Sequence, residues 1–277
     1  MNNLSIFDTH CHLADKKYHD HDIKQIIHEA EKEGIKHILN VGYDLKSNQI
    51  VIEQLKQFSN LFGAIGLHPN DGKNNFSEEN LNWIEKQLVN KRIIAIGEIG
   101  LDYYWEKNPD YRENQKYWFK KQLELAKKHN LPVLLHIRGE DNEEKFTETF
   151  NDAYEIVKKA GIKKGILHCF TGTWEIAQQF IELGFYVSFA GNITYKNAKW
   201  KDKWEKALEK IPLGRIVIET DAPYLTPEPW RGKVNYPQYI IHTLKKIAEI
   251  RKKVIHEIAS IIFSNTLQLF KISYNTR

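Results

Sequence analysis

Short runs of apolar residues, most of them β-branched or aromatic, recur along the whole chain and alternate with longer segments of mixed polarity. Continuous apolar runs of this length are typical of strands that are buried on both faces, as in parallel sheets. The pattern predicts eight strands, at residues 5–9, 37–41, 62–67, 93–97, 132–136, 165–168, 186–190 and 215–220.

The segments between these strands have the spacing of amphipathic helices. Between residues 22 and 34, an apolar stripe is followed by Gly34, which is a common residue at a helix end; the stripe consists of Ile23, Ile26, Ile27 and Ala30. Further helices are predicted at residues 78–89, 111–130, 143–160, 175–183, 201–209, 237–251 and 254–270. Residues 71–77 and 105–109 are predicted to be loops.

Strands and helices that alternate over the whole chain predict an α/β fold. Eight strands favour a closed (β/α)8 TIM barrel over an open doubly wound sheet, and 277 residues are close to the roughly 250 that are typical of such a barrel. We see neither an internal repeat nor a linker. Residues 1–277 are therefore predicted to form one domain.

The composition is that of a globular protein, with 42% hydrophobic and 27% charged residues. A formal charge of +4 permits a polyanionic substrate without requiring one. The first residues lack the features of a signal peptide, and the chain contains no apolar run long enough for a membrane span. Because Cys11 and Cys169 do not suggest a disulfide framework, we expect a cytoplasmic protein.

Several side chains that can bind metal ions stand at or just past the ends of the predicted strands. They are His10, His12, Glu98, His136, His168 and Asp221. In a parallel barrel the carboxyl ends of the strands meet at one mouth, so these groups are predicted to lie together there. A single buried histidine or carboxylate usually only forms hydrogen bonds. Six of them in one place favour a site for two divalent cations, since so many buried acceptors need a counter-charge.

Residues two apart in a strand face the same way, which predicts the side chains that share a face near these strand ends. Asp8, His10 and His12 are predicted to share one face of the first strand, with Phe7, Thr9 and Cys11 on the other. The same rule points Glu219 and Asp221 inward on one face. Asp8 and Glu219, which share a face with predicted ligands, are expected to orient those ligands. His68 follows the third strand, where a role in substrate binding, in orienting ligands or in structure alone is open.

These motifs together resemble the TatD family of metal-dependent deoxyribonucleases, within the amidohydrolase-like barrels. The resemblance rests on residues 8–13 (DTHCHL), 97–103 (GEIGLDY), 136–138 (HIR), 168–172 (HCFTG), 219–225 (ETDAPYL) and 231–233 (RGK). The motifs follow the family's order over nearly the whole chain. Each one is modest by itself, but the set is highly specific.

The resemblance implies a ligand assignment. His10 and His12 would hold one metal ion with Asp221, His136 and His168 would hold the other, and Glu98 would bridge the two. Imidazole and carboxylate ligands suit Zn or Mn, and the carboxylates also admit Mg. Asp221 and Glu98 would then be the catalytic residues of a two-metal site.

The resemblance also implies hydrolysis of the phosphodiester bonds of DNA, from a strand end, by water that the metal ions activate. His68, Arg138 and Phe170 are the candidate substrate-binding residues; Arg138 would neutralise phosphate charge, and Phe170 would either stack on a base or pack within the barrel. The alternative is a hydrolase of the same barrel type that acts on a small ester, lactone, amide or phosphotriester. A binding protein without catalytic activity is disfavoured by the complete ligand set.

Overall fold

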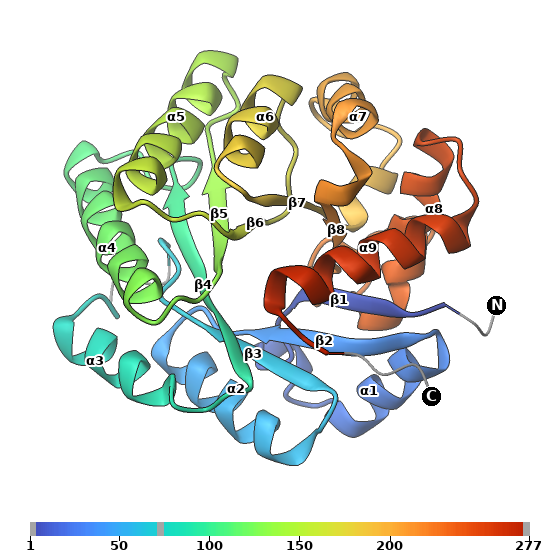
Figure 1. Cartoon of the computed structure of the whole chain (residues 1–277), viewed down its shortest axis with the longest axis horizontal. Helices are drawn as coiled ribbons and strands as arrows, with labels where there is room; N and C mark the ends of the chain where they lie inside the picture. The colour runs from blue at the N-terminus through green and yellow to red at the C-terminus, as the bar shows by residue number, and fades with distance from the viewer. Residues whose placement is uncertain (1–3, 71–74, 274–277) are drawn as a thin grey trace.

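Eight parallel strands lie side by side in sequence order and are surrounded by helices, as Figure 1 shows, which confirms the predicted (β/α)8 TIM barrel. The structure is a computed structural model that describes residues 4–70 and 75–273. The strands are β1 (Ile6–Cys11), β2 (Ile35–Val41), β3 (Leu61–Ile65), β4 (Ile93–Asp102), β5 (Val133–Arg138), β6 (Gly165–Leu167), β7 (Tyr186–Phe189) and β8 (Ile216–Ile218).

The helices follow the predicted order, with one addition between β2 and β3. They are α1 (Ile23–Lys32), α2 (Leu45–Gln57), α3 (Glu78–Gln87), α4 (Pro109–Lys128), α5 (Glu143–Ala160), α6 (Trp174–Glu182), α7 (Lys201–Lys210), α8 (Ile240–Ile250) and α9 (Ile255–Phe270). Polar side chains begin several of them: Asp22, Ser77 and Thr173 each accept a backbone N–H of the first turn. A loop precedes α4 as predicted, whereas residues 71–74 of the predicted loop 71–77 lie outside the described residues.

Helix α2 was not predicted because its buried face is largely polar. Asn48 exchanges hydrogen bonds with the backbone of Gly66, and Gln54 donates to the carbonyl oxygen of Leu13. These amides replace the apolar residues on which a hydrophobic stripe depends. They also fix the segments that carry His68 and His12, so this polar helix face supports the barrel mouth.

The predicted strict alternation in β1 is wrong. Phe7 packs in the barrel interior against Phe62 and Phe270, although His10 and His12 also point inward. The pairing of β1 with β2 is irregular between Asp8 and Cys11. An extra residue in one strand re-aims the side chains that follow it, and such bulges are common beside active sites.

The barrel closes where β1 meets the chain just after β8. The backbone N–H of Asp221 donates to the carbonyl oxygen of His10 over 2.9 Å, and the N–H of His12 donates to that of Ala222 over 2.7 Å. The hydroxyl of Thr9 donates to the carbonyl oxygen of Ile218. This contact between β1 and the chain after β8, the barrel seam, therefore brings Asp221 beside the two histidines of β1.

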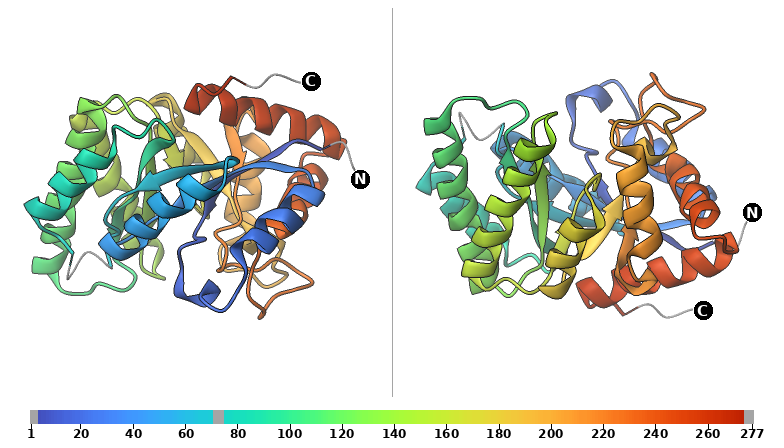
Figure 2. Two further views of the ribbon diagram at one scale, coloured as in Figure 1. Left: turned by 90° about the horizontal axis from the view of Figure 1, so that it is seen from below. Right: turned by 90° about the horizontal axis from the view of Figure 1, so that it is seen from above.

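Helix α9 lies across the end of the barrel opposite to the loops that follow the strands (Figures 1 and 2). Its residues Phe263, Leu269 and Phe270 belong to the same buried cluster as the inward-facing residues Phe7 and Val217. With this end filled by apolar side chains, the mouth at the carboxyl ends of the strands is the end that is left for polar chemistry.

Asp8 is expected to stabilise the barrel seam. Its fully buried carboxylate accepts the backbone N–H of Thr220 over 2.9 Å and the hydroxyl of Thr220 over 2.6 Å. Replacing Asp8 by alanine leaves this N–H unsatisfied and should lower the free energy of unfolding by about 1–3 kcal/mol, measured by chemical denaturation. Asp8→Asn keeps an acceptor oxygen and should lose less; equal losses in the two variants would contradict this role.

Candidate metal centre

The structure gathers all six predicted ligands at the mouth of the barrel. His10 and His12 come from the end of β1, and His136 lies on β5. His168 and Asp221 follow β6 and β8, and the backbone of Asp221 has a φ of 56°, in the left-handed region that aspartate tolerates better than most residues. Glu98 was predicted just past a strand end but lies within β4, which continues to Asp102.

The two oxygens of Glu98 face two different groups of histidines. Oε2 lies 3.4 Å from Nε2 of His10 and 3.6 Å from Nε2 of His12. Oε1 lies 2.8 Å from Nδ1 of His136 and 3.4 Å from Nε2 of His168. The carboxylate therefore stands between two sets of nitrogen ligands, which is the position that a bridging ligand requires.

The distances define overlapping groups of potential ligand atoms, each group within 4.8 Å. One group contains His10, His12 and Asp221, as the resemblance implied. Glu98 is shared by two others, which are Glu98 with His10 and His168, and Glu98 with His68 and His136. His136 thus groups with His68, a residue for which metal binding was not predicted.

The orientation of two histidines tests whether a cation fits this place. His12 Nδ1 lies 2.8 Å from the carbonyl oxygen of Val41, which can only accept, so this nitrogen carries a proton. In neutral His12, a lone pair on Nε2 then faces His10 Nε2 at 3.2 Å and the carboxylate oxygens of Glu98 and Asp221. His168 Nδ1 lies 2.9 Å from Glu219, which turns its Nε2 towards Glu98, and this nitrogen becomes an acceptor when a cation displaces its proton. Converging acceptors of this kind fit divalent cations.

Asp102 is a residue of the site that the sequence reasoning missed. Its Oδ2 lies 3.0 Å from Nε2 of His136 and accepts a hydrogen bond from the amide of Asn70 over 2.7 Å. Carboxylates in this position orient ligating histidines. The signal was present in the sequence, because Asp102 follows Glu98 by four residues and therefore shares its face of the strand.

Opposite charges at short range shift the pKa values of the site. Burial alone would raise the pKa of Glu98, but the charges of His68, His168 and His10 hold it well below its usual range. Burial alone would lower the pKa of His136, yet hydrogen bonds to Asp102 and Glu98 raise it to about 9. The pKa of His168 is raised to about 10, against the effect of burial, by Glu219 and Glu98. Glu98 is therefore ionised and available to a cation, which would displace protons from His136 and His168.

A pocket of about 570 Å³ opens above this cluster. Its wall includes Asp15, whose carboxylate accepts hydrogen bonds from the hydroxyls of Tyr43 and Tyr224 over 3.2 and 2.7 Å. Both tyrosine rings stand edge-on to the ring of His12. Arg138 and Trp105 also line the pocket, and the guanidinium of Arg138 lies 4.0 Å from the ring centre of Tyr104.

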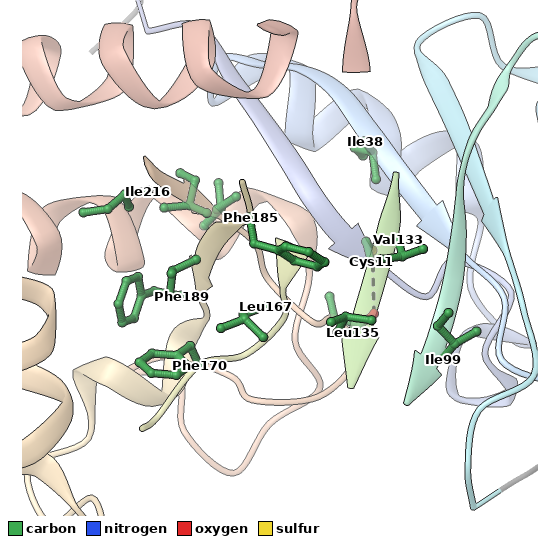
Figure 3. Close-up of a cluster of buried hydrophobic side chains, with 14 of the residues drawn as sticks. Cys11, Ile38, Ile99, Val133, Leu135, Leu167, Phe170, Phe185, Phe189 and Ile216 are labelled. Atoms are coloured by element: carbon green, nitrogen blue, oxygen red, sulfur yellow. Dashed lines mark hydrogen bonds between the residues drawn. The ribbon is translucent and has the colours of Figure 1, made fainter. Parts of the chain in front are cut away.

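Phe170 is not at this pocket. Its side chain is 2% exposed and packs edge-on against Phe150 and Phe189 in the core between strands and helices, as Figure 3 shows for Phe189. The prediction that Phe170 stacks on a base is therefore wrong for this conformation, and the alternative of barrel packing holds. His68 and Arg138, the other two predicted substrate contacts, do line the pocket.

The fold and the site define a metal-dependent hydrolase of the TIM-barrel class. The family model described as "TatD related DNase" matches residues 7–271, and the chain belongs to this family. A Bacillus subtilis protein described as the uncharacterized metal-dependent hydrolase YabD is 39% identical over 97% of this chain and 100% of its own length. A Mycoplasma genitalium protein of the same description, MG009, is 34% identical over 96% of this chain and 99% of its own.

Solved structures agree with this assignment. YjjV, a TatD homologue from Escherichia coli, aligns with a TM-score of 0.86 and 28% identity over 97% of this chain and 98% of its own. An organophosphorus hydrolase variant aligns with a TM-score of 0.60 and 11% identity over 96% and 93% of the two chains, which shows the fold alone.

None of the helices within the described residues combines the length and the apolar character that a membrane span requires.

Proposed function

We propose that this protein hydrolyses the phosphodiester bonds of DNA with two divalent cations. The observation that carries the proposal is the placement of Glu98, whose two carboxylate oxygens face two groups of histidines. His10, His12 and Asp221 would hold one ion, and His136 with His168 or His68 would hold the other, with Glu98 shared. Mg, Zn and Mn all suit such ligands.

Divalent cations at this place would supply positive charge for the phosphoryl oxygens and would make a water molecule more acidic. The residues of the chain do the remaining work. Asp221, which lines the pocket with a side chain 13% exposed, would accept the proton of the attacking water. Arg138, at the pocket wall, would donate hydrogen bonds to the non-bridging oxygens.

The shape of the site supports attack from a strand end. The ligands lie at the bottom of a pocket in the barrel mouth, and His10 and Glu98 are almost fully buried. A single strand terminus enters such a pocket more readily than the middle of a duplex, so we propose an exonuclease. The free thiols of Cys11 and Cys169 support the further proposal of a reducing, cytoplasmic location.

The decisive experiment combines metal analysis with timed digestion of end-labelled single-stranded DNA. We expect bound divalent metal, stepwise shortening of the oligonucleotide from one end, release of mononucleotides, and loss of activity with a chelator. Turnover of small esters, lactones, amides or phosphotriesters without any digestion of DNA would overturn the proposal in favour of the alternative substrate class.

Replacing Arg138 by alanine should weaken the handling of substrate without disturbing the metal ions. Because Arg138 is exposed and contacts Tyr104 rather than a ligand, its loss should reduce kcat/KM for DNA by about tenfold to hundredfold, as expected for charge-assisted hydrogen bonds. Metal content should stay at the wild-type level. Arg138→Lys keeps the charge but not the planar fork of the guanidinium, so its kcat/KM should lie between those of the wild type and Arg138→Ala. Unchanged kcat/KM in Arg138→Ala would assign the residue to structure alone.

A further inference from the structure

A second pocket, of about 270 Å³, lies beside the candidate metal centre and shares Arg138 with it. It is formed by loops that follow several strands, together with the end of β5 and the first turns of α5 and α7. Its lining includes Tyr104, Arg138, Tyr195, Lys199, Trp200 and Arg231. Anything that occupies it while bound at the metal centre must pass Arg138, so the two pockets are suited to adjacent units of one substrate.

The charges that line this second pocket are mostly positive once internal ion pairs are considered. Glu140 is neutralised by Arg112 at 2.8 Å and Lys107 at 2.9 Å. Asp141 is paired with Lys199 at 2.9 Å. These two carboxylates therefore leave little negative charge to repel an anion.

The two arginines of the second pocket each lie against an aromatic ring. In residues 4–70 and 75–273, neither Arg138 nor Arg231 forms a salt bridge with a carboxylate, and each guanidinium instead lies against a ring. The guanidinium of Arg231 lies 4.2 Å from the ring centre of Tyr195, as that of Arg138 lies 4.0 Å from the centre of Tyr104. An arginine stacked on an aromatic ring keeps the N–H groups at its edge free, and these groups match phosphate oxygens.

We propose that the second pocket binds the phosphate next to the scissile one in a single-stranded nucleic acid, with Arg231 as its main contact. This inference rests on the proposed function, because it takes the metal centre as the place of cleavage. Arg138 stands between the two pockets and would contact the backbone that joins the two phosphates. The second pocket makes Arg231 a substrate-binding residue that favours chains of two or more phosphodiesters over a single one.

The test compares two substrates in the metal-loaded protein. One is a single-stranded oligonucleotide, and the other is the p-nitrophenyl ester of thymidine 5′-phosphate, which has one phosphodiester and reaches only the metal centre. In Arg231→Ala we expect kcat/KM to fall by about tenfold or more for the oligonucleotide, chiefly through KM, and to stay unchanged for the small ester. Arg231→Lys should recover part of the loss because it keeps the charge.

Salt dependence gives a second readout. The affinity for a phosphorothioate-protected oligonucleotide should decrease with salt in the wild type, and in Arg231→Ala the slope of log K against log salt should be smaller by about 0.7, the value for one contact to a single strand. Lys86→Ala is the matched control. Lys86 is an exposed cation in the last turn of α3, and its loss removes the same charge away from the second pocket. We expect the control to keep the wild-type slope.

The outcomes separate the inference from the proposed function. If the wild type hydrolyses neither substrate, the proposed function fails, and the inference fails with it. If the wild type hydrolyses both and Arg231→Ala keeps the wild-type kcat/KM for the oligonucleotide, only the inference is overturned. An equal loss on both substrates would also overturn it, since Arg231 would then act on the metal centre or on folding.

Discussion

Replacing Glu98 by alanine is expected to reduce hydrolysis by more than about a hundredfold and to lower the metal content of the purified protein. Loss of an outer group that only orients a ligand costs about tenfold to hundredfold, and Glu98 lies closer to the centre than any such group. Its two oxygens approach His10 and His12 on one side and His136 and His168 on the other. Both ions would lose a ligand at once.

The matched control for Glu98→Ala is Glu219→Gln. Glu219 is also fully buried, but it lies 2.9 Å from Nδ1 of His168, on the side of that ring that faces away from Glu98. We expect the activity of Glu219→Gln to be lower than that of the wild type by about tenfold to hundredfold, with most of the metal retained. Metal analysis of the purified variants and rates at saturating metal give both quantities. An alanine variant at position 98 with wild-type metal content would contradict the shared-ligand role.

The barrel itself could be predicted because its strands are buried on both faces. Continuous apolar runs such as residues 93–96 of β4 (IIAI), 133–135 of β5 (VLL) and 216–218 of β8 (IVI) are signals that few other structures produce. The six candidate ligands could be found for the same reason, since polar groups at the ends of such runs are conspicuous. What the apolar pattern cannot show is a helix such as α2, whose buried face is held by the amides of Asn48 and Gln54.

Details of geometry at the barrel mouth also escaped the sequence pattern, because tertiary contacts decide them. The irregular pairing of β1 overrides strict alternation, so Phe7 shares the barrel interior with His10. Strand β4 runs on past Glu98 through pairing with β5, where Asp102 lies opposite Arg138. This extension places Asp102 beside His136. Similarly, no local signal separates a buried Phe170 from one that faces a substrate.

The second pocket depends still more on tertiary structure. Its residues are separated by long stretches of sequence, from Tyr104 after β4 to Arg231 beyond β8. Most of them belong to loops with no regular pattern, so the sequence shows only scattered aromatic and basic residues. Loops after the strands carry function in barrels of this type, while the strands fix where those loops begin.

Asp221→Asn is expected to separate proton transfer from metal binding. Asparagine keeps an oxygen near His12, whose Nε2 lies 3.4 Å from Oδ1 of Asp221, but it carries no charge and accepts no proton. The rate at saturating metal should therefore fall by about a hundredfold to ten-thousandfold, the usual contribution of a general base. The fall in metal content should be much smaller than the fall in rate.

The control for Asp221→Asn is Asp15→Asn, which neutralises another carboxylate of the same pocket. Asp15 accepts hydrogen bonds from Tyr43 and Tyr224 instead of facing the histidine nitrogens. The rate of Asp15→Asn should therefore differ from that of the wild type by less than about tenfold. Metal content and single-turnover rates are measured on the same samples. If the rate of Asp221→Asn falls only in proportion to its metal content, Asp221 acts as a ligand alone and another group accepts the proton. If both carboxylates matter equally, the charge of the pocket as a whole, rather than a base at position 221, controls the reaction.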